Sequence, residues 1–268
     1  MIDHYLAFAD RILPFTKDRP LSMNRFPNGI EADGFFQKDV DVNQVPSWVK
    51  TVPIHSKSTG RGVDYIICNN AATLLYVANL GSIEINPWLS THQKMEKPVF
   101  AVLDLDPNGA EMDVLVGVAQ TAHRLFGEAG LHDFIKTSGS TGLHIYIYLN
   151  QRYTYDIARD FIQFIAEMVH DEHPESTSLI RDPKKRKGKI YLDYLQNRRG
   201  QTMVAPYSVR PKPYAPVSTP LHWDEVRPGL KISDYTIRNL PARVGRIKDP
   251  WAAIFDHPAD LKQALGKF

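Results

Sequence analysis

The sequence predicts an α+β fold. Apolar runs rich in β-branched residues indicate strands, and stretches with apolar residues at helical spacing indicate helices. The two kinds of element do not follow the strict alternation of βαβ units. The 268 residues are 43% hydrophobic and 23% charged, which is typical of a globular chain and excludes a disordered or collagen-like one. No internal repeat, low-complexity tract or linker divides the sequence, so we expect a single domain over residues 1–268.

In the N-terminal part, a helix is expected over Ile2–Leu13, because its apolar residues recur three and four positions apart. Pro20 and the turn at residues 27–29 (Pro-Asn-Gly) follow as helix breakers. The other elements expected here are an extended piece at Phe35-Phe36, a strand over Asp64–Cys68, a helix over Ala71–Leu80 and an extended segment over Ser82–Ile85.

In the remainder of the chain, Pro98–Leu105 is predicted to be a buried strand from its apolar and β-branched content. Glu111–Ala129 has the pattern of an amphipathic helix. Further elements expected are strands over Phe134–Lys136 and Leu143–Leu149 around a Gly/Ser turn, a helix over Ile157–Val169, strands over Lys189–Leu195 and around Met203–Ser208, and short helices near the C-terminus.

Composition excludes several classes of protein. A single cysteine, Cys68, rules out an intramolecular disulfide framework and a cysteine-based zinc site. No apolar run approaches the ~18 residues that a membrane span needs. The N-terminus lacks the basic region of a secretory signal, so we expect a cytoplasmic protein with no membrane partner.

The basic residues are unevenly distributed. Net charge is only +2, but Arg181–Lys189 holds six basic residues against one acidic residue, and Arg198, Arg199, Arg210 and Lys212 follow. Such a run is either a solvated face or a loop that binds phosphates, and the sequence leaves both interpretations open.

Two aspartates stand at the end of the strand predicted over Pro98–Leu105. Asp104 and Asp106 are two positions apart, so in a strand they project from the same face. Adjacent carboxylates repel one another unless a positive charge lies between them, and Mg²⁺ or Mn²⁺ suits such oxygen ligands. The alternative is that the acids belong to the Asp-Pro-Asn-Gly turn before the next helix.

A second strand carries Asp193 between apolar neighbours, and burying such an acid unpaired is costly. Asp193 is either ion-paired with a nearby arginine or a third metal ligand beside Asp104 and Asp106. Three carboxylates from two strands are what a two-metal phosphoryl-transfer site needs.

The third motif is the turn Ser138–Gly142, followed by His144. Gly/Ser turns can expose backbone N–H groups and hydroxyls to an anion, although an ordinary hairpin with a satisfied histidine gives the same pattern. The glycine spacing is not that of a Walker loop.

Together, the paired aspartates, the Ser-Gly-x-x-Gly-x-His turn and the Tyr-Leu-Asp strand resemble the archaeo-eukaryotic primase superfamily. More closely, they resemble the polymerase domain of bacterial ATP-dependent DNA ligase D. Further stretches that fit this family are Arg19–Ser22, Arg25–Gly29, Gly34–Lys38, Ala205–Arg210 and Val217–Leu221.

The resemblance implies an RRM-like primase-polymerase catalytic core flanked by a mixed β-sheet and helices. It implies template-directed addition of NTPs or dNTPs to a primer 3′ end, with two Mn²⁺ or Mg²⁺ ions, in gap filling or end joining during double-strand break repair. The implied partners are DNA, a DNA ligase and a Ku-like end-binding protein at the nucleoid. No ligase or nuclease domain is expected within these residues.

The resemblance also assigns roles to individual positions. Asp104, Asp106 and Asp193 match the family's catalytic and metal-binding acids. Residues of the triphosphate-binding turn and its surroundings are Ser138, Gly139, Thr141, Gly142, His144, Gln196 and Arg210. Residues on the DNA side are Arg25, Phe35, Phe36, Lys38, Lys184, Lys185 and Arg186. Of the Phe35-Phe36 pair, only one can face inward from an alternating strand, so we expect the other to be exposed.

Three departures from the family pattern stand out. Thr141 takes the place of a lysine common in relatives, and Asn86 takes the place of a histidine. Relatives also carry N-terminal lysines that grip a downstream 5′-phosphate, and without them we expect little preference for phosphorylated gaps. A stand-alone primase and a non-catalytic nucleic-acid-binding relative are the alternative functions.

Overall fold

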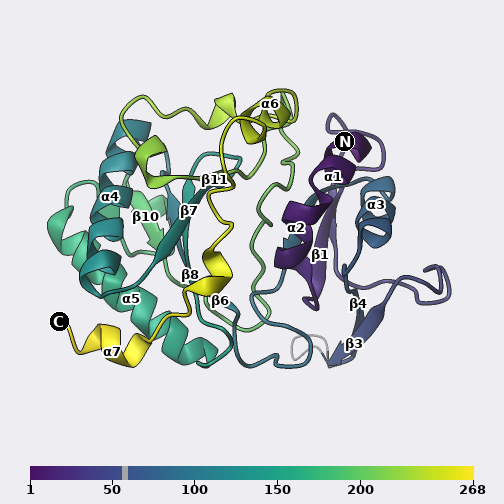
Figure 1. Cartoon of the computed structure of the whole chain (residues 1–268), viewed down its shortest axis with the longest axis horizontal. Coiled ribbons are helices and arrows are strands. Elements are labelled where there is room, and N and C mark those ends of the chain that lie inside the picture. Colours follow the sequence, from purple (N-terminus) through teal and green to yellow (C-terminus); the bar gives the residue numbers. More distant parts are fainter. Residues whose placement is uncertain (56–59) are drawn as a thin grey trace.

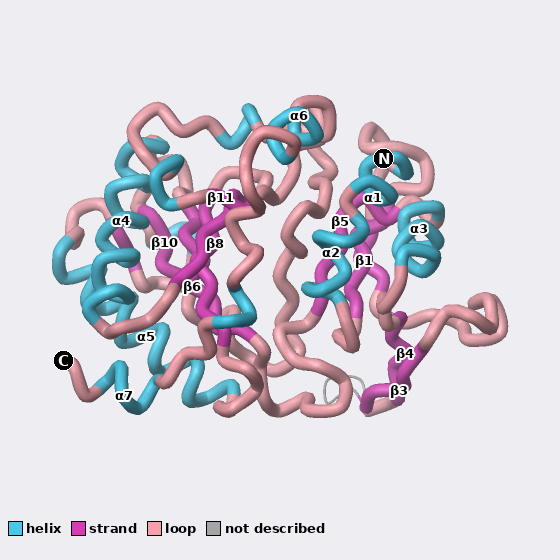
Figure 2. Tube along the Cα trace, in the orientation of Figure 1, coloured by secondary structure: helices cyan, strands magenta, loops and turns pink. Residues whose placement is uncertain are grey.

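A computed structural model covers the chain, and residues 1–55 and 60–268 are described. Helices and strands are mixed without regular alternation, as expected for an α+β fold, and the strands form two main sheets (Figures 1 and 2). Within the described residues, no helix is long and apolar enough to cross a membrane.

The larger sheet has six strands in the order β11-β7-β8-β6-β10-β9. All of its pairings are antiparallel except the one between β9 and β10. The strands are β6 (Phe100–Asp106), β7 (Asp133–Thr137), β8 (Leu143–Tyr148), β9 (Thr177–Ser178), β10 (Ile190–Asp193) and β11 (Pro220–Leu221).

Helices α4 (Met112–Glu128) and α5 (Tyr155–Glu172) cover one face of this sheet (Figure 1). Strand alternation decides which side chains meet them: Leu103 and Leu105 point into the core formed with the helices, whereas Asp104 and Asp106 point to the opposite face. The apolar residues of β6 therefore hold the strand in place, and its acids are left on the face that the two helices do not cover.

Part of that opposite face is closed by aromatic packing. Phe100 and Tyr146 pack with Trp251, whose indole N–H donates to the Ile135 carbonyl at 2.9 Å. The acidic end of β6 lies beyond this cluster and is free to line a cavity.

The smaller sheet has the order β2-β1-β5, with β1 (Leu21–Arg25), β2 (Phe35–Gln37) and β5 (Ser82–Pro87). It packs with α1 (Ile2–Ala7), α2 (Ala9–Thr16) and α3 (Ala71–Asn79) around a second core (Figure 1). A separate antiparallel pair consists of β3 (Thr51–His55) and β4 (Gly62–Ile66).

Short elements complete the chain. They are the helices α6 (Leu240–Val244) and α7 (Leu261–Leu265) and the 3₁₀ turns Pro183–Lys185, Trp223–Glu225, Ile232–Asp234 and Ile254–Asp256. The C-terminal Phe268 contacts Phe164 of α5, with ring centroids 5.5 Å apart, so the end of the chain lies beside that helix (Figure 1).

The strand expected around Met203–Ser208 is wrong. This segment follows β5 for a short distance, with Met203 N–H donating to the Pro87 carbonyl at 3.2 Å and Ala205 N–H to the Ile85 carbonyl at 2.9 Å. Pro206 then has no N–H to continue the ladder, and Tyr207 has a φ of 64°. The backbone leaves the sheet at this point instead of adding a strand.

Other differences concern boundaries. The first helical segment continues to Thr16 and is interrupted at Phe8, and β4 lies two residues earlier than expected. Strands β1 and β3 were not anticipated, since polar residues and a proline obscure their short patterns.

Candidate active site

Four side chains form a row across the uncovered face of the larger sheet. Strand register places Asp193 opposite Asp104, Asp104 opposite His144, and His144 opposite Lys136. Directly opposed residues of antiparallel strands project from the same face, so β10, β6, β8 and β7 each contribute one polar group. The row does not arise from proximity in the sequence: it exists because four apolar strands pair in this register.

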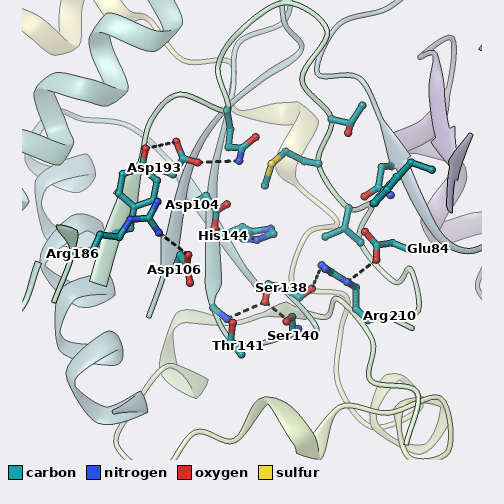
Figure 3. A pocket seen from close by; sticks show the side chains of 18 residues that line it. Glu84, Asp104, Asp106, Ser138, Ser140, Thr141, His144, Arg186, Asp193 and Arg210 are labelled. Carbon is teal, nitrogen blue, oxygen red and sulfur yellow. Dashed lines mark hydrogen bonds and ion pairs between the residues drawn. The ribbon is translucent and has the colours of Figure 1, made fainter. Parts of the chain in front are cut away.

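The acidic end of the row lines a cavity of about 450 Å³ between the two sheets (Figure 3). Asp106, the second acid of β6, also lines it. Most of the predicted catalytic and nucleotide-binding residues meet here: Asp104, Asp106, Asp193, Ser138, Thr141, Gly142, His144, Gln196 and Arg210. The smaller sheet adds Phe36, Glu84 and Asn86 to the wall.

The surroundings of Asp104 disfavour its charged form. Burial raises its pKa to about 7, and repulsion from Asp193 and then Asp106 acts in the same direction, against the opposing effect of Lys136 and Arg210. A cation placed among the three carboxylates would remove this penalty.

Asp106 is paired with an arginine from the basic segment. Arg186 Nη1 lies 3.1 Å from Asp106 Oδ2, and the guanidinium stacks 3.8 Å from the centroid of the Tyr191 ring (Figure 3). Arg186 is only 6% exposed, and its Nε donates to the Ile180 carbonyl at 3.0 Å. Of the two interpretations of the basic run, the solvated face therefore does not apply to Arg186.

Asp193 accepts hydrogen bonds from its own strand and from the turn that follows it. It accepts hydrogen bonds from Leu195 N–H at 2.8 Å, Gln196 Nε2 at 3.0 Å and the Tyr191 hydroxyl at 3.2 Å. Asp193 and Asp106 thus have different partners, and the described residues contain no group of three His, Cys, Asp or Glu side chains close enough to hold a metal.

The residues nevertheless fit a divalent cation. The donors are carboxylate oxygens, the ligands that Mg²⁺ and Mn²⁺ prefer, and Asp104 faces Asp193 across adjacent strands. Burial and the neighbouring acids raise the pKa of Asp104, and a cation bound here would offset both effects.

The Ser138–Gly142 turn is built around the serine hydroxyl. Ser138 Oγ accepts from the N–H groups of Ser140 and Gly142, each at 3.0 Å (Figure 3). The expected exposure of backbone donors is thus realised only in part, because two of them are used inside the turn. Gly139, with a φ of 69°, packs against Val217 and Ser218 where a side chain would collide.

Arg210 is fixed beside this turn. Its Nε lies 3.0 Å from Glu84 Oε2, and its Nη1 donates to the Ser138 carbonyl at 2.9 Å (Figure 3). Asn86, next to this pair, is 5% exposed, and its Nδ2 has no partner within the described structure. Asn86 lines the cavity, and its unpaired amide donor is buried in the wall.

The predicted DNA-side residues lie outside the cavity, apart from Phe36 and Arg186. Phe35 and Phe36 are 48% and 62% exposed, so both rings, and not only one, are largely accessible. Arg25 stacks 5.3 Å from the Phe35 ring centroid, and Lys38, Lys184 and Lys185 are exposed.

Two charged residues at or beside the cavity were missed by the sequence analysis. Lys136 is completely buried beside His144, and Glu84 is the partner of Arg210. A charged residue inside an apolar strand was the available signal for Lys136, since lysine is almost never fully buried without a role.

A cavity lined by paired acids, a serine turn and fixed basic groups, on an antiparallel sheet with two helices behind it, defines a domain of the primase-polymerase type. The sequence model of the family described as "LigD, primase-polymerase domain" matches residues 1–251, and the chain belongs to this family.

Similar proteins support the same family assignment. The chain is 34% identical over 255 residues to the multifunctional non-homologous end joining protein LigD of Pseudomonas aeruginosa, a match that covers 94% of this chain and 30% of the relative. It is 32% identical over 262 residues to the bifunctional LigD of Bacillus subtilis, covering 97% of this chain and 41% of that protein. The chain therefore spans less than half the length of these relatives.

A solved structure confirms the expected fold. The polymerase domain from Mycobacterium tuberculosis ligase D, in complex with DNA, superimposes with a TM-score of 0.87 at 26% sequence identity. The match covers 96% of this chain and 92% of that one, so the α+β primase-polymerase fold extends over nearly the whole sequence.

Proposed function

We propose that this chain is a template-directed nucleotidyltransferase that adds ribonucleotides or deoxynucleotides to a primer 3′ end. The observation that carries the proposal is the convergence of Asp104, Asp106 and Asp193 on one cavity that is also lined by Ser138, His144 and Arg210. In the reaction, the 3′ oxygen bonds to the α-phosphorus of the nucleotide, the bond to pyrophosphate breaks, and the hydroxyl proton passes to solvent.

Two divalent ions, Mn²⁺ or Mg²⁺, would be held by the three aspartates. Bound there, they would supply charge neutralisation for the triphosphate and a lowered pKa for the attacking hydroxyl. The chain itself places the three carboxylates: the β6–β10 pairing fixes Asp104 and Asp193, and Arg186 holds Asp106.

The nucleotide would lie along the remaining cavity wall. His144 and Arg210 offer donors for its phosphate oxygens, and the Ser138–Gly142 turn, including Gly139 and Thr141, shapes that side. Thr141 supplies no charge, so the positive charge beside the turn comes from Arg210. The side chains of Asn86, whose buried Nδ2 has no partner, and Gln196 are polar contacts for the sugar or base.

DNA would approach over the cavity mouth. Phe35 and Phe36 present exposed rings on which bases can stack, with Arg25 and Lys38 beside them. Lys184, Lys185 and Arg186 belong to the basic segment just before β10, which suits contact with primer phosphates.

We infer that residues 1–268 act as one domain in gap filling or end joining during double-strand break repair, in the cytoplasm at the nucleoid. The names of the relatives support this setting, as does the neighbouring structure bound to DNA. A DNA ligase would then seal the product, and a Ku-like protein would hold the ends.

The test is incorporation of labelled NTPs with Mn²⁺ on a primed and an unprimed template. Extension of the primed template alone supports the polymerase function, and products on the unprimed template would show a primase. Absence of incorporation on either, with DNA binding retained, would leave a non-catalytic DNA-binding protein and reject the proposal.

A further inference from the structure

Lys136 is a buried base that the proposed reaction does not use. It lies on β7, is 0% exposed, and within the described residues no carboxylate lies at ion-pair distance from its amine. Instead, Nζ lies 2.8 Å from His144 Nδ1 and 2.6 Å from Ser218 Oγ. A buried amine held by two uncharged partners is costly, which calls for a role beyond packing.

Ser218, Lys136 and His144 form a series of hydrogen bonds, and the donor of each bond can be assigned starting from Ser218. Ser218 Oγ donates its single proton to the Thr137 carbonyl at 2.9 Å. Its oxygen must therefore accept from Lys136, which fixes one N–H of the amine. Ser218 is itself completely buried, so water does not compete for these bonds.

The surroundings of His144 are consistent with Lys136 as the donor. On the other side of the ring, His144 Nε2 lies 3.4 Å from Asp104 Oδ1. A proton on Nε2 suits this contact better than a lone pair facing a carboxylate oxygen, and it leaves Nδ1 as the acceptor. Lys136 is the donor that Nδ1 meets at 2.8 Å.

We propose that Lys136 is a positioning residue that fixes His144 as the Nε2–H tautomer, so that its N–H is directed into the cavity as a donor to a nucleotide phosphate. The assignment needs two N–H groups on Nζ, one for Ser218 and one for His144, and both an ammonium and a neutral amine provide them. An ammonium can only donate, which makes Nδ1 the acceptor. A neutral amine also has a lone pair, and the proposal assigns that lone pair away from the ring. Burial, together with Arg210, lowers the pKa of Lys136 well below its usual value.

This inference rests on the proposed nucleotide site, and it makes the specific prediction that a residue away from the ligand controls affinity for it. Lys136 does not itself line the cavity. Without its donor, the ring is free to place the proton on Nδ1, and Nε2 then presents a lone pair to the phosphate oxygens. The Nε2 lone pair and the phosphate oxygens then repel one another, and the hydrogen bond between His144 and the nucleotide is lost.

The first experiment is long-range ¹H–¹⁵N spectroscopy of the histidine rings in the free protein, with His144 assigned by loss of its signals in His144→Gln. The expected pattern in the wild type is a protonated Nε2 and an unprotonated Nδ1. In Lys136→Met, which keeps the length of the side chain and removes the donor, the His144 nitrogen shifts should move toward a mixture of tautomers.

The second experiment measures MgATP binding by calorimetry without DNA. Lys136→Met should weaken binding about tenfold, as expected for loss of one hydrogen bond to a charged phosphate. Ser218→Ala should act in the same direction with a smaller effect. Ile135→Val, a change in the neighbouring residue on the opposite face of β7, should alter neither the spectrum nor the affinity.

A wild-type spectrum with the proton on Nδ1 would overturn the assignment. So would a Lys136→Met variant with unchanged His144 shifts and unchanged MgATP affinity. The spectrum tests the tautomer whether or not the chain polymerises nucleotides, so its failure is distinguishable from failure of the proposed function.

Discussion

The carboxylates of Asp106 and Asp193 differ in what holds them, and this difference can be tested at the level of single residues. Asp106 meets the guanidinium of Arg186, whereas Asp193 accepts bonds from its own chain segment. Both carboxylates are proposed to bind the same metal ions as Asp104. The hydrogen-bond partners of Asp106 and Asp193 should therefore not compensate for loss of the carboxylate charge.

Asp106→Asn and Asp193→Asn should each reduce nucleotide addition by at least about 100-fold, because each removes a metal ligand whose effect is worth several kcal/mol. Affinity for primed DNA should stay within about threefold, since the carboxylate that is removed repels phosphates. The exposed Asp171, changed to Asn, is the matched control. Near-normal turnover in either site variant would rule out the metal-site assignment.

A second prediction at this scale concerns Glu84, which is 5% exposed and paired with Arg210. Glu84→Gln keeps the shape and removes the charge that orients the guanidinium. We expect the KM for NTP to rise roughly fivefold, about 1 kcal/mol, with a smaller change in kcat. Steady-state kinetics on a primed template measures this, and an unchanged KM would mean that the Ser138 carbonyl alone is enough to hold Arg210.

At the scale of elements, the basic segment Arg181–Lys189 divides into a buried and an exposed part. Arg186 is anchored in the site, while Lys184 and Lys185 are exposed on a 3₁₀ turn. We therefore expect Arg186 to act in the cavity and the two exposed lysines to contribute to DNA affinity.

Lys184→Ala with Lys185→Ala should flatten the salt dependence of DNA binding. The slope of log affinity against log salt should fall by roughly one for each DNA phosphate that the variant no longer neutralises. Lys262→Ala, in the short helix α7, is the control and should leave the slope as it is. Equal slopes for the double variant and the wild type would show that the two lysines only face solvent.

The elements that could be predicted from sequence are those with strong local patterns. The apolar run ending in Asp104 and Asp106 indicated β6, and the same-face geometry of the two acids followed from strand alternation. By contrast, the path of residues 203–208 depends on hydrogen bonds to β5, about 120 positions away along the chain, and no local pattern contains them. The partnership of Lys136 with His144 likewise depends on the β7–β8 register.

At the scale of the whole molecule, the cavity depends on two sheets that each have their own core. The larger sheet contributes the acids and the serine turn, and the smaller one contributes Glu84, Asn86 and Phe36. The integrity of the smaller core can be monitored through the single cysteine of the chain, Cys68, which is part of it.

Cys68 is 0% exposed, and burial raises the pKa of its thiol to about 12. The thiolate is the reactive form, so the folded protein should resist iodoacetamide at about pH 8, well below that pKa, and react fully in denaturant. Mass spectrometry of the two samples provides the measurement. Rapid alkylation of the native protein would show that the core around α3 opens readily.

The most direct test of the central claim is extension of a primer across a one-nucleotide gap, with each NTP supplied singly and Mn²⁺ present. The account predicts that the wild type adds the nucleotide complementary to the template and that Asp104→Asn adds none. Addition that ignores the template, or that persists in Asp104→Asn, would contradict it.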